Sequence, residues 1–264
     1  ATRFDFISVN DATYGSIHSP TNLGSGGSGA KGGGAIRLRV TGTTTLAAGG
    51  FVRARGADTS NGAGAGGSIF LSTARLAGTG DIRADGGNAS NSGDGGGGRV
   101  ALVLTDPEAD FASWSGASTA YGGSGRPPRA AAGTVYRQAG DGSDSLMVDN
   151  NNAVTRNLST RMPPGVDLNS FDDVTIRRQG VLGVRADTAL DLDTFATTCA
   201  GPGESFLHLA ADDAVTYPAD WTIDGYTVLG DGISKPLANL TIGTNGALYH
   251  LANVDADARR LTLA

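Results

Sequence analysis

A repeat of glycine-led apolar segments is the feature that most constrains the fold of this chain. Four segments begin at Gly34, Gly67, Gly98 and Gly133, and apolar residues follow each glycine. The four glycines are 33, 31 and 35 residues apart. In the first segment, the apolar Ile36, Leu38 and Val40 alternate with arginines. Alternate residues of a strand point to opposite faces, so this pattern predicts that the segments are strands. A regular interval of this size is typical of stacked repeat units that bury apolar surface only against their neighbours.

Two shorter segments follow each leading strand and complete the predicted unit. The second segments are Thr45-Leu-Ala-Ala-Gly49, Arg75-Leu-Ala-Gly78 and Ala112-Ser-Trp-Ser-Gly116. The third segments are Val52-Arg-Ala-Arg-Gly56, Ile82-Arg-Ala-Asp-Gly86 and Ser118-Thr-Ala-Tyr-Gly122. Stacking of the units is expected to place these leading-strand residues in one column: Ile36, Ile69, Val100 and Val135. Glycine-rich loops at 57–66, 87–97 and 123–132 then occupy one position in each unit, so they are expected to emerge from one edge.

These observations predict an all-β chain folded as a right-handed parallel β-helix or closely related β-solenoid, with its glycine-rich loops protruding from one edge. Residues 1–145 carry the long repeat. In residues 146–264 the glycine-rich loops are lost, and the segment at 174–182 resembles 240–248 at a spacing of 66. That spacing predicts shorter coils of about 22 residues in the same elongated unit. Tight turns are expected at Gln179-Gly180 and Asn245-Gly246.

The ends of such a fold expose strand edges and apolar core. We therefore expect further coils of the same chain, or identical subunits, to be stacked end to end. The net charge of −6 argues against a nucleic-acid partner, which requires concentrated Lys and Arg. Since no apolar stretch is long enough for a membrane span, membrane insertion of this segment is not expected. Glycine is abundant, at 42 of 264 residues, but it lacks the G-X-Y period of collagen.

The glycine-rich segments also resemble a known class of protein. The run Gly15-Ser-Ile-His-Ser-Pro-Thr-Asn-Leu-Gly-Ser-Gly-Gly-Ser-Gly29, with the Gly-Gly-Gly-Ala-Ile-Arg-Leu that follows, resembles the glycine-rich β-helical repeat region of large bacterial surface proteins. The resemblance covers roughly residues 14–152. It implies an extracellular, adhesin-like or stalk-like role at the cell surface and no defined reaction.

The acidic residues and histidines form no pattern that assigns a catalytic role. The carboxylate pairs are Asp172-Asp173, Asp191 with Asp193, and Asp212-Asp213. Aspartates in such positions are also typical of turns, so no catalytic residue is assigned. His18, His208 and His250 lie too far apart for a metal-binding motif. The last two alternate with apolar neighbours and are expected on the outward face of strands, whereas Cys199 is expected to be a small buried residue.

Calcium is the only cofactor that the sequence suggests. Gly140-Asp-Gly-Ser-Asp-Ser-Leu146 fits most of the G-x-G-x-D-x-apolar unit of calcium-binding β-rolls. Asp141 and Asp144 are the candidate ligands, because calcium prefers carboxylate and carbonyl oxygens. Only one copy of the unit is present, and an ordinary turn is the alternative interpretation.

The leading functional hypothesis is a structural segment of an extracellular bacterial surface protein, such as an adhesin, stalk or filament, without catalytic activity. The first alternative is a β-helix that binds or cleaves carbohydrate, with surface polysaccharide as its partner. Its candidate sugar-stacking residues are Trp114, Tyr121 and Trp221, with Tyr136 and Tyr226 as further aromatic side chains. The second alternative is a phage tail fibre or spike component.

Overall fold

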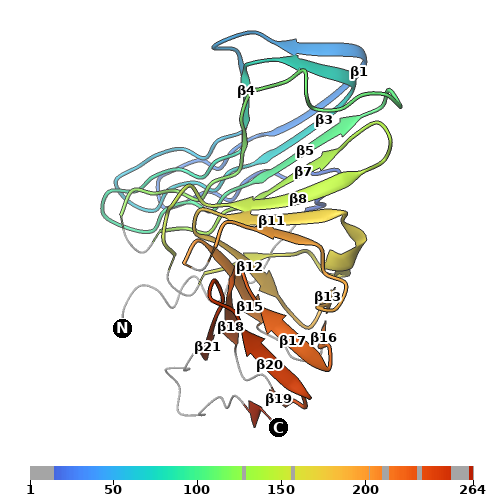
Figure 1. The fold of residues 1–264 in the computed structure, drawn as a ribbon. Helices are drawn as coiled ribbons and strands as arrows, with labels where there is room; N and C mark the ends of the chain where they lie inside the picture. The colour runs from blue at the N-terminus through green and yellow to red at the C-terminus, as the bar shows by residue number, and fades with distance from the viewer. Residues whose placement is uncertain are drawn as a thin grey trace.

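The computed structural model describes residues 15–126, 129–155, 158–201, 203–209, 214–230, 234–250 and 262–263. These residues form strands, turns and one short 3-10 helix, η1 (Leu168–Ser170). The strands lie in six sheets (Figure 1). Within this part of the chain, no helix has the length and apolar character to cross a membrane.

The largest sheet has seven strands and runs through most of the molecule. In spatial order these strands are β1 (Ala35–Leu46), β3 (Ser68–Gly78), β5 (Arg99–Leu104), β7 (Thr134–Gln138), β8 (Asp144–Asp149), β11 (Asp173–Arg177) and β14 (Thr197–Cys199). Neighbouring strands are parallel except for β7 and β8, which are antiparallel. The predicted column is confirmed, because the paired residues of the first four strands are Ile36, Ile69, Val100 and Val135.

Three parallel sheets carry most of the other strands. A three-stranded sheet contains β2 (Phe51–Arg53), β4 (Asp81–Arg83) and β6 (Ser118–Thr119). In this sheet Val52 pairs with Ile82, and Ile82 pairs with Ser118, which confirms the predicted alignment of the third segments. A five-stranded sheet has the order β21 (Ala247–His250), β18 (Thr227–Gly230), β15 (Ser205–Leu209), β12 (Gly180–Val184) and β9 (Thr160–Arg161). The last three-stranded sheet contains β10 (Val166–Asp167), β13 (Thr188–Asp191) and β16 (Val215–Thr216).

Two pairs of parallel strands complete the described structure: β17 (Asp220–Ile223) with β20 (Asn239–Ile242), and β19 (Ser234–Lys235) with β22 (Thr262–Leu263). In the five-stranded sheet, the paired residues are Leu182, Leu207, Val228 and Leu248, which are 25, 21 and 20 residues apart. The turn between β11 and β12 contains Arg178 and Gln179, one residue earlier than predicted. Both have positive φ, at 48° and 67°.

The predicted parallel β-helix or β-solenoid is wrong. The strands form several separate sheets, the main sheet is mixed, and the described residues contain no closed solenoid. The hairpin between β7 and β8 explains the difference, because it reverses the strand direction within the main sheet. The chain therefore does not continue one rising coil from its first half into its second.

The hairpin also separates two hydrophobic cores. Val135 pairs with Met147 and Tyr136 with Leu146, so the members of each pair share a face of the sheet. The first pair contacts a core that also contains Ile69, Leu71, Ile82, Val100 and Leu102. The second pair belongs to another core, with Leu168, Val174, Ile176, Leu182 and Leu207. The seven-stranded sheet thus has a core on each face, one built mainly by each half of the chain.

The glycine-rich loops extend together from one side of the main sheet, as predicted, and lie beside one another (Figure 1). We call residues 54–67, 84–98, 120–126 and 129–133 the glycine layer. Across each loop, an amide bonds a carbonyl of the opposite arm: Gly64 N to Ala57 O, Gly95 N to Gly87 O and Ala130 N to Gly123 O. Between loops, Gly87 N bonds Gly64 O, and Gly123 N bonds Gly95 O. The loops are therefore joined by backbone hydrogen bonds in two directions.

Close backbone approach explains why the layer needs glycine. A Cβ atom on Gly64 would lie 2.0 Å from the carbonyl oxygen of Lys31, and one on Gly97 would lie 2.0 Å from that of Ala120. No larger residue fits at these distances without moving the backbone. Glycine here provides close packing between neighbouring loops.

Strand β1 forms an edge of the main sheet. Its residues Leu38 and Val40 are 38% and 36% exposed, whereas Leu71, which pairs with Leu38 on β3, is buried. The neighbouring Phe51 of β2 is exposed as well. The expected stacking of further coils or subunits remains a prediction, and this apolar edge is where it would occur.

Candidate functional site

A groove of about 540 Å³ opens where the glycine layer leads into strands β3, β5 and β7. One side is formed by Asn22, Leu23 and Ser25, and the other by residues 159–161. The floor consists of equivalent residues from three repeats, at 65–68, 96–99 and 131–133. The groove is therefore a product of the repeat, because one backbone path recurs three times side by side.

Arg99 lies at the centre of this floor. It is the first residue of β5 and pairs with Ser68 and Thr134, the first residues of β3 and β7. Arg99 is the charged member of this row. Arg99 is only 8% exposed, and its guanidinium donates a hydrogen bond to Thr134 Oγ1 at 3.0 Å. Burial lowers the pKa of Arg99 to about 10, which leaves the side chain protonated at neutral pH.

A second guanidinium lies in the opposite wall. Arg161 belongs to β9, which is held against the floor by a hydrogen bond from Thr160 Oγ1 to Ala132 O at 2.8 Å. Burial, and then the positive charge of Arg185, lower the pKa of Arg161. The described lining of the groove thus contains two arginines.

Two adjacent glycines of the floor have different surroundings. A Cβ atom on Gly97 would meet Ala120 O at 2.0 Å and Gly133 N at 2.3 Å. A Cβ atom on Gly96 would meet nothing nearer than 3.9 Å. A side chain at Gly96 would therefore extend into open space.

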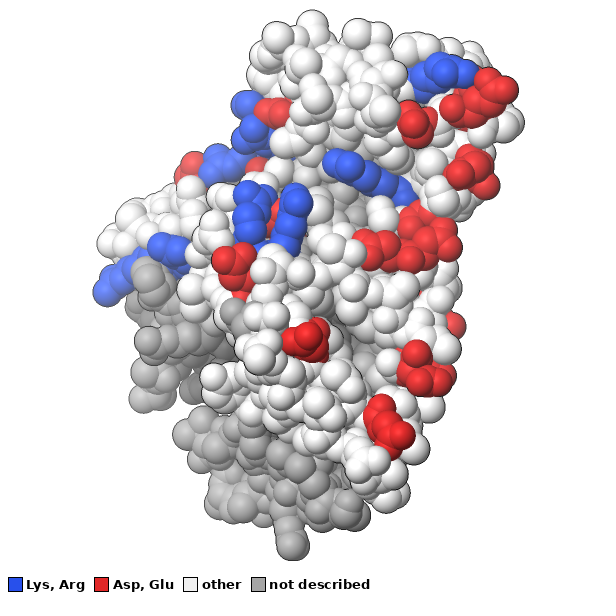
Figure 2. All heavy atoms as spheres, viewed as in Figure 1, with Lys and Arg blue, Asp and Glu red and all other residues white. Residues whose placement is uncertain are grey.

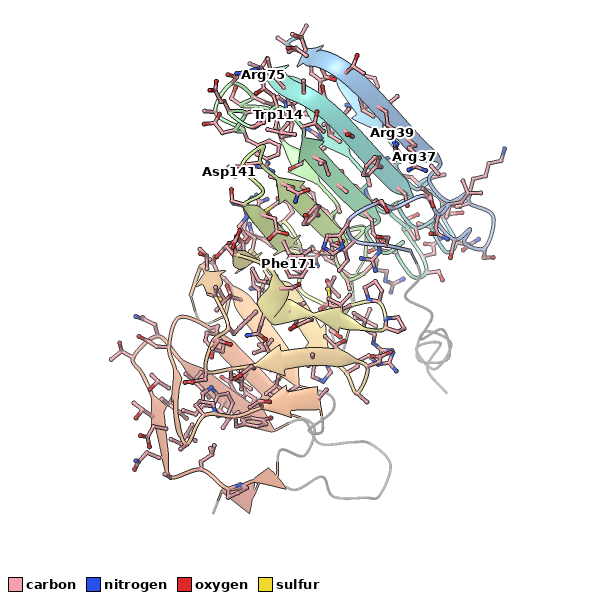
Figure 3. The ribbon with its side chains drawn as sticks, turned by 90° about the vertical axis from the view of Figure 1, so that its right-hand side faces the viewer. Arg37, Arg39, Arg75, Trp114, Asp141 and Phe171 are labelled. Carbon is pink, nitrogen blue, oxygen red and sulfur yellow. The ribbon has the colours of Figure 1, made fainter. Side chains whose placement is uncertain are left out.

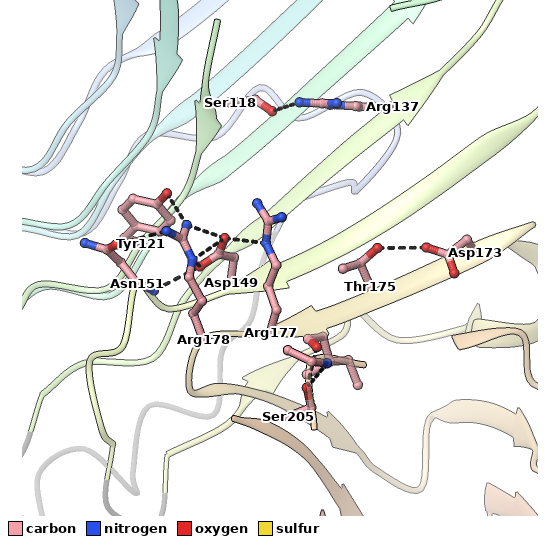
Figure 4. Close-up of polar contacts among 12 residues, drawn as sticks. Ser118, Tyr121, Arg137, Asp149, Asn151, Asp173, Thr175, Arg177, Arg178 and Ser205 are labelled. Atoms are coloured by element: carbon pink, nitrogen blue, oxygen red, sulfur yellow. Dashed lines mark hydrogen bonds and ion pairs between the residues drawn. The ribbon is translucent and has the colours of Figure 1, made fainter. Parts of the chain in front are cut away.

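An ion-pair network lies elsewhere, at the end of β8 (Figure 4). Asp149 accepts hydrogen bonds from Arg177 Nε at 2.8 Å, from Arg178 Nη2 at 2.5 Å and from the Asn151 amide at 2.9 Å. Its side chain is only 3% exposed. The bond to this carboxylate raises the pKa of the Arg178 guanidinium. The network joins β8 to the turn after β11, which makes it a structural connection. Near the middle of the face seen in Figure 2, charged side chains of both signs lie side by side.

The predicted sugar-stacking residues are engaged in packing and polar contacts. Trp114 is 5% exposed, and its Nε1 donates to Gly80 O at 2.8 Å in the first core (Figure 3). Trp221 is 2% exposed and packs edge-on against Tyr217. The Tyr121 hydroxyl accepts from Arg178 Nη2 at 2.6 Å, and the same guanidinium lies over the Tyr121 ring. The two tryptophans are thus placed in the interior, and the exposed side of Tyr121 is shared with an arginine.

The predicted calcium ligands lie in the hairpin between β7 and β8. Asp141 Oδ1 accepts hydrogen bonds from the amide and hydroxyl of Ser143, and these bonds lower the pKa of the Asp141 carboxyl. Asp144 Oδ2 accepts from the Tyr136 hydroxyl, and Asp144 Oδ1 accepts from the Asp172 amide. The described residues contain no group of three or more metal-ligating side chains. Calcium binding stays a prediction, and the observed role of this segment is the turn.

The other aspartates considered for catalysis cap turns or bond strand hydroxyls. Asp191 Oδ1 accepts from the amide of Asp193. The Asp173 carboxylate accepts from the hydroxyls of Thr175 and Thr198. Asp212-Asp213 lies outside the described residues.

The histidines are dispersed, as their spacing predicts. His18 stacks on Phe171 and meets Tyr136 edge-on. His208 alternates with the buried Leu207 and Leu209, so it lies on the face of β15 opposite to them, where it is half-buried rather than fully exposed. It lines an apolar pocket of about 190 Å³ with Phe206 and Leu229 among others. The side chain of His250 lies outside the described part of the structure.

Comparison of the chain with protein-family models gives no match, and comparisons with curated proteins and with solved structures give no significant match either. The groove with Arg99 and Arg161 was not predicted from the sequence. One signal was available, because Gly98-Arg-Val contains a charged residue where the equivalent Gly67-Ser-Ile and Gly133-Thr-Val have hydroxyls. Arg161 had no comparable signal, since it approaches from a different part of the chain.

Proposed function

We propose that this chain is a rigid structural segment of an extracellular bacterial surface protein, of the adhesin, stalk or filament kind, and performs no reaction of its own. The glycine layer is the observation that carries the proposal. Long loops are normally mobile surface segments. In this chain, they are packed against one another and bonded in two directions along successive repeats.

The physical basis of rigidity is the loss of alternative backbone conformations. Glycine is ordinarily the most flexible residue, and ordering it is entropically unfavourable. The layer offsets that loss with backbone hydrogen bonds, each of which contributes about 1 kcal/mol net. The ordered glycine layer would form a rigid region beside the main sheet. Such rigidity suits a structural segment that holds other domains at a fixed distance.

Hydrogen–deuterium exchange tests the rigidity. Peptides covering 57–66 and 87–97 are expected to exchange as slowly as β5, whereas the exposed turn at 47–49 provides a fast internal reference. Exchange of the glycine-layer peptides at the rate of that turn would overturn the proposal, because hydrogen bonds that open freely cannot hold a fixed spacing.

Location is tested separately on intact bacteria that carry the full-length protein. An antibody against this segment is expected to label intact cells as strongly as lysed cells. Labelling that appears only after lysis contradicts the extracellular assignment and leaves the exchange result unaffected.

A further inference from the structure

Two arginines lie on one face of the main sheet, on either side of β8. Arg137 of β7 pairs with Ser145 of β8, and Arg177 of β11 pairs with Asp149 of β8. Ser145 and Asp149 are four positions apart on one strand, so the side chains of all four residues share a face. Figure 4 shows Arg177 rising from β11 toward the side where Arg137 reaches Ser118. We call the space between the two guanidinium groups the arginine gap.

The first core holds Arg137 in place without an acid partner. Its Nη2 donates to Ser118 Oγ on β6 at 2.7 Å, and its guanidinium carbon lies 5.4 Å and 5.3 Å from the ring centroids of Phe111 and Trp114. Among the described residues, no acid pairs with Arg137, and its buried Nε has no hydrogen-bond partner. Burial lowers the pKa of Arg137, and the positive charge of Arg177 lowers this pKa further. The two cations are therefore close enough to repel each other.

Arg177 has donors that its own ion pair leaves unused. Its Nε bonds Asp149 Oδ2 at 2.8 Å, and its side chain is 45% exposed. Within the described part of the chain, neither of its Nη atoms donates a hydrogen bond (Figure 4). Asp149 also accepts bonds from Arg178 and from the Asn151 amide. This one carboxylate is thus shared by two arginines and is already bonded on both of its oxygens.

We propose that the arginine gap binds a tetrahedral oxyanion, a sulfate or phosphate group that is either free or esterified to a larger ligand. The groups available there are hydrogen-bond donors. They include the Arg177 Nη atoms and the Ser118 hydroxyl, whose oxygen accepts from Arg137 and whose proton can rotate toward a ligand. A ligand that offers only acceptor oxygens suits this set. The proposal goes beyond the structural role given above, since a rigid segment needs no ligand.

Shape and charge favour a tetrahedral oxyanion over a carboxylate. The two guanidinium groups come from different strands and approach from different directions (Figure 4). Sulfate and phosphate present oxygens in several directions and can accept from both groups, whereas the two oxygens of a carboxylate lie in one plane and suit a single guanidinium fork. An anion in the gap would also relieve the repulsion between Arg137 and Arg177. Beside the half-buried Arg137 it would interact more strongly than at a fully exposed arginine.

The test is calorimetric titration of the full chain with inorganic sulfate and inorganic phosphate at constant ionic strength, with acetate as the carboxylate for comparison. Sulfate is expected to bind at least about tenfold more tightly than acetate. Arg177→Gln is expected to weaken sulfate binding by at least about tenfold. Arg75→Gln is the matched control, because Arg75 is 49% exposed and its Nε bonds Asp106 Oδ2 at 2.7 Å, an ion pair of the same type that shares no member with the gap. It should change the affinity by less than about twofold.

A second variant guards against a purely structural effect of the first. Arg137→Gln removes the charge on the other side of the gap while its amide can still bond Ser118, and it should weaken sulfate binding to a similar extent. Sulfate binding no tighter than acetate binding would overturn the proposal. So would a sulfate affinity that both variants leave unchanged while circular dichroism shows them folded.

Galactose 6-sulfate and galactose 6-phosphate distinguish the two sources of the oxyanion. Binding of an ester at least as tight as that of the free ion supports a group carried by a larger ligand. Binding of the free ions alone supports a site for a free oxyanion. If neither the free ions nor the esters bind, the proposal is wrong, and the measurements of exchange and cell-surface labelling described above are unaffected.

Discussion

Two neighbouring glycines show how differently one residue type is used in this molecule. Gly97→Ala forces a methyl group against backbone atoms of Ala120 and Gly133, and we expect it to destabilise the protein by about 3 kcal/mol through overpacking and disturbed hydrogen bonds. Gly96→Ala meets no close atom and should be neutral or slightly stabilising, because it restricts the unfolded chain. Urea unfolding of both variants checks the contrast. Equal stabilities would show that the backbone relaxes around Gly97.

The thiol of Cys199 gives a second prediction at the residue scale. Burial raises the pKa of Cys199, although the residue is partly exposed rather than fully buried as the sequence suggested. A raised pKa leaves less thiolate at any given pH, so alkylation by iodoacetamide at pH 8 is expected to be slower than for a free cysteine. Unfolding in urea should restore the ordinary rate. Mass spectrometry measures both, and an unchanged rate in the folded protein would contradict the prediction.

Between elements, the Asp149 carboxylate connects the end of β8 to Arg177 and Arg178. Removal of this carboxylate in Asp149→Ala leaves Arg177 and Arg178 without their shared partner at a buried position. Since both arginines are partly exposed, we expect a loss of about 2 to 3 kcal/mol, below the full effect of breaking a buried pair. Asp141→Ala is the control, because its carboxylate bonds only within its own turn. Thermal unfolding should separate the two variants clearly.

Strand registers of the first half were predictable because the period-2 alternation and the leading glycines align the repeats without ambiguity. The hairpin between β7 and β8 was missed. Gly140-Asp-Gly-Ser suits a turn as well as a calcium-binding unit, and the sequence alone does not choose between them. The two cores were also beyond prediction, since residues on both faces of β7 are buried and alternation then ceases to indicate which face meets which core. The groove depends on Arg161, a contact between distant segments that no local pattern encodes.

At the scale of the whole molecule, the exposed edge at β1 predicts self-association. Among the described strands, β1 pairs on one side only, and its exposed Leu38 and Val40 favour pairing with another chain. We expect sedimentation velocity to show concentration-dependent association that Val40→Lys reduces, because a charge on an edge strand opposes pairing. Val154→Lys is the control, since Val154 is exposed but lies outside this edge. Association that is unaffected by Val40→Lys would place the contact elsewhere.

The glycine layer also reverses an ordinary expectation about how protein sequences change. Loops usually accept substitutions and insertions more readily than the strands that they connect. In the glycine layer, a single added methyl group at a position such as Gly64 meets the backbone of the preceding glycine-rich segment, at Lys31. Over time, the core strands of this protein can exchange Val for Ile or Leu with little effect, while the loop glycines are fixed. Homologous chains should therefore share their loops more faithfully than their strands.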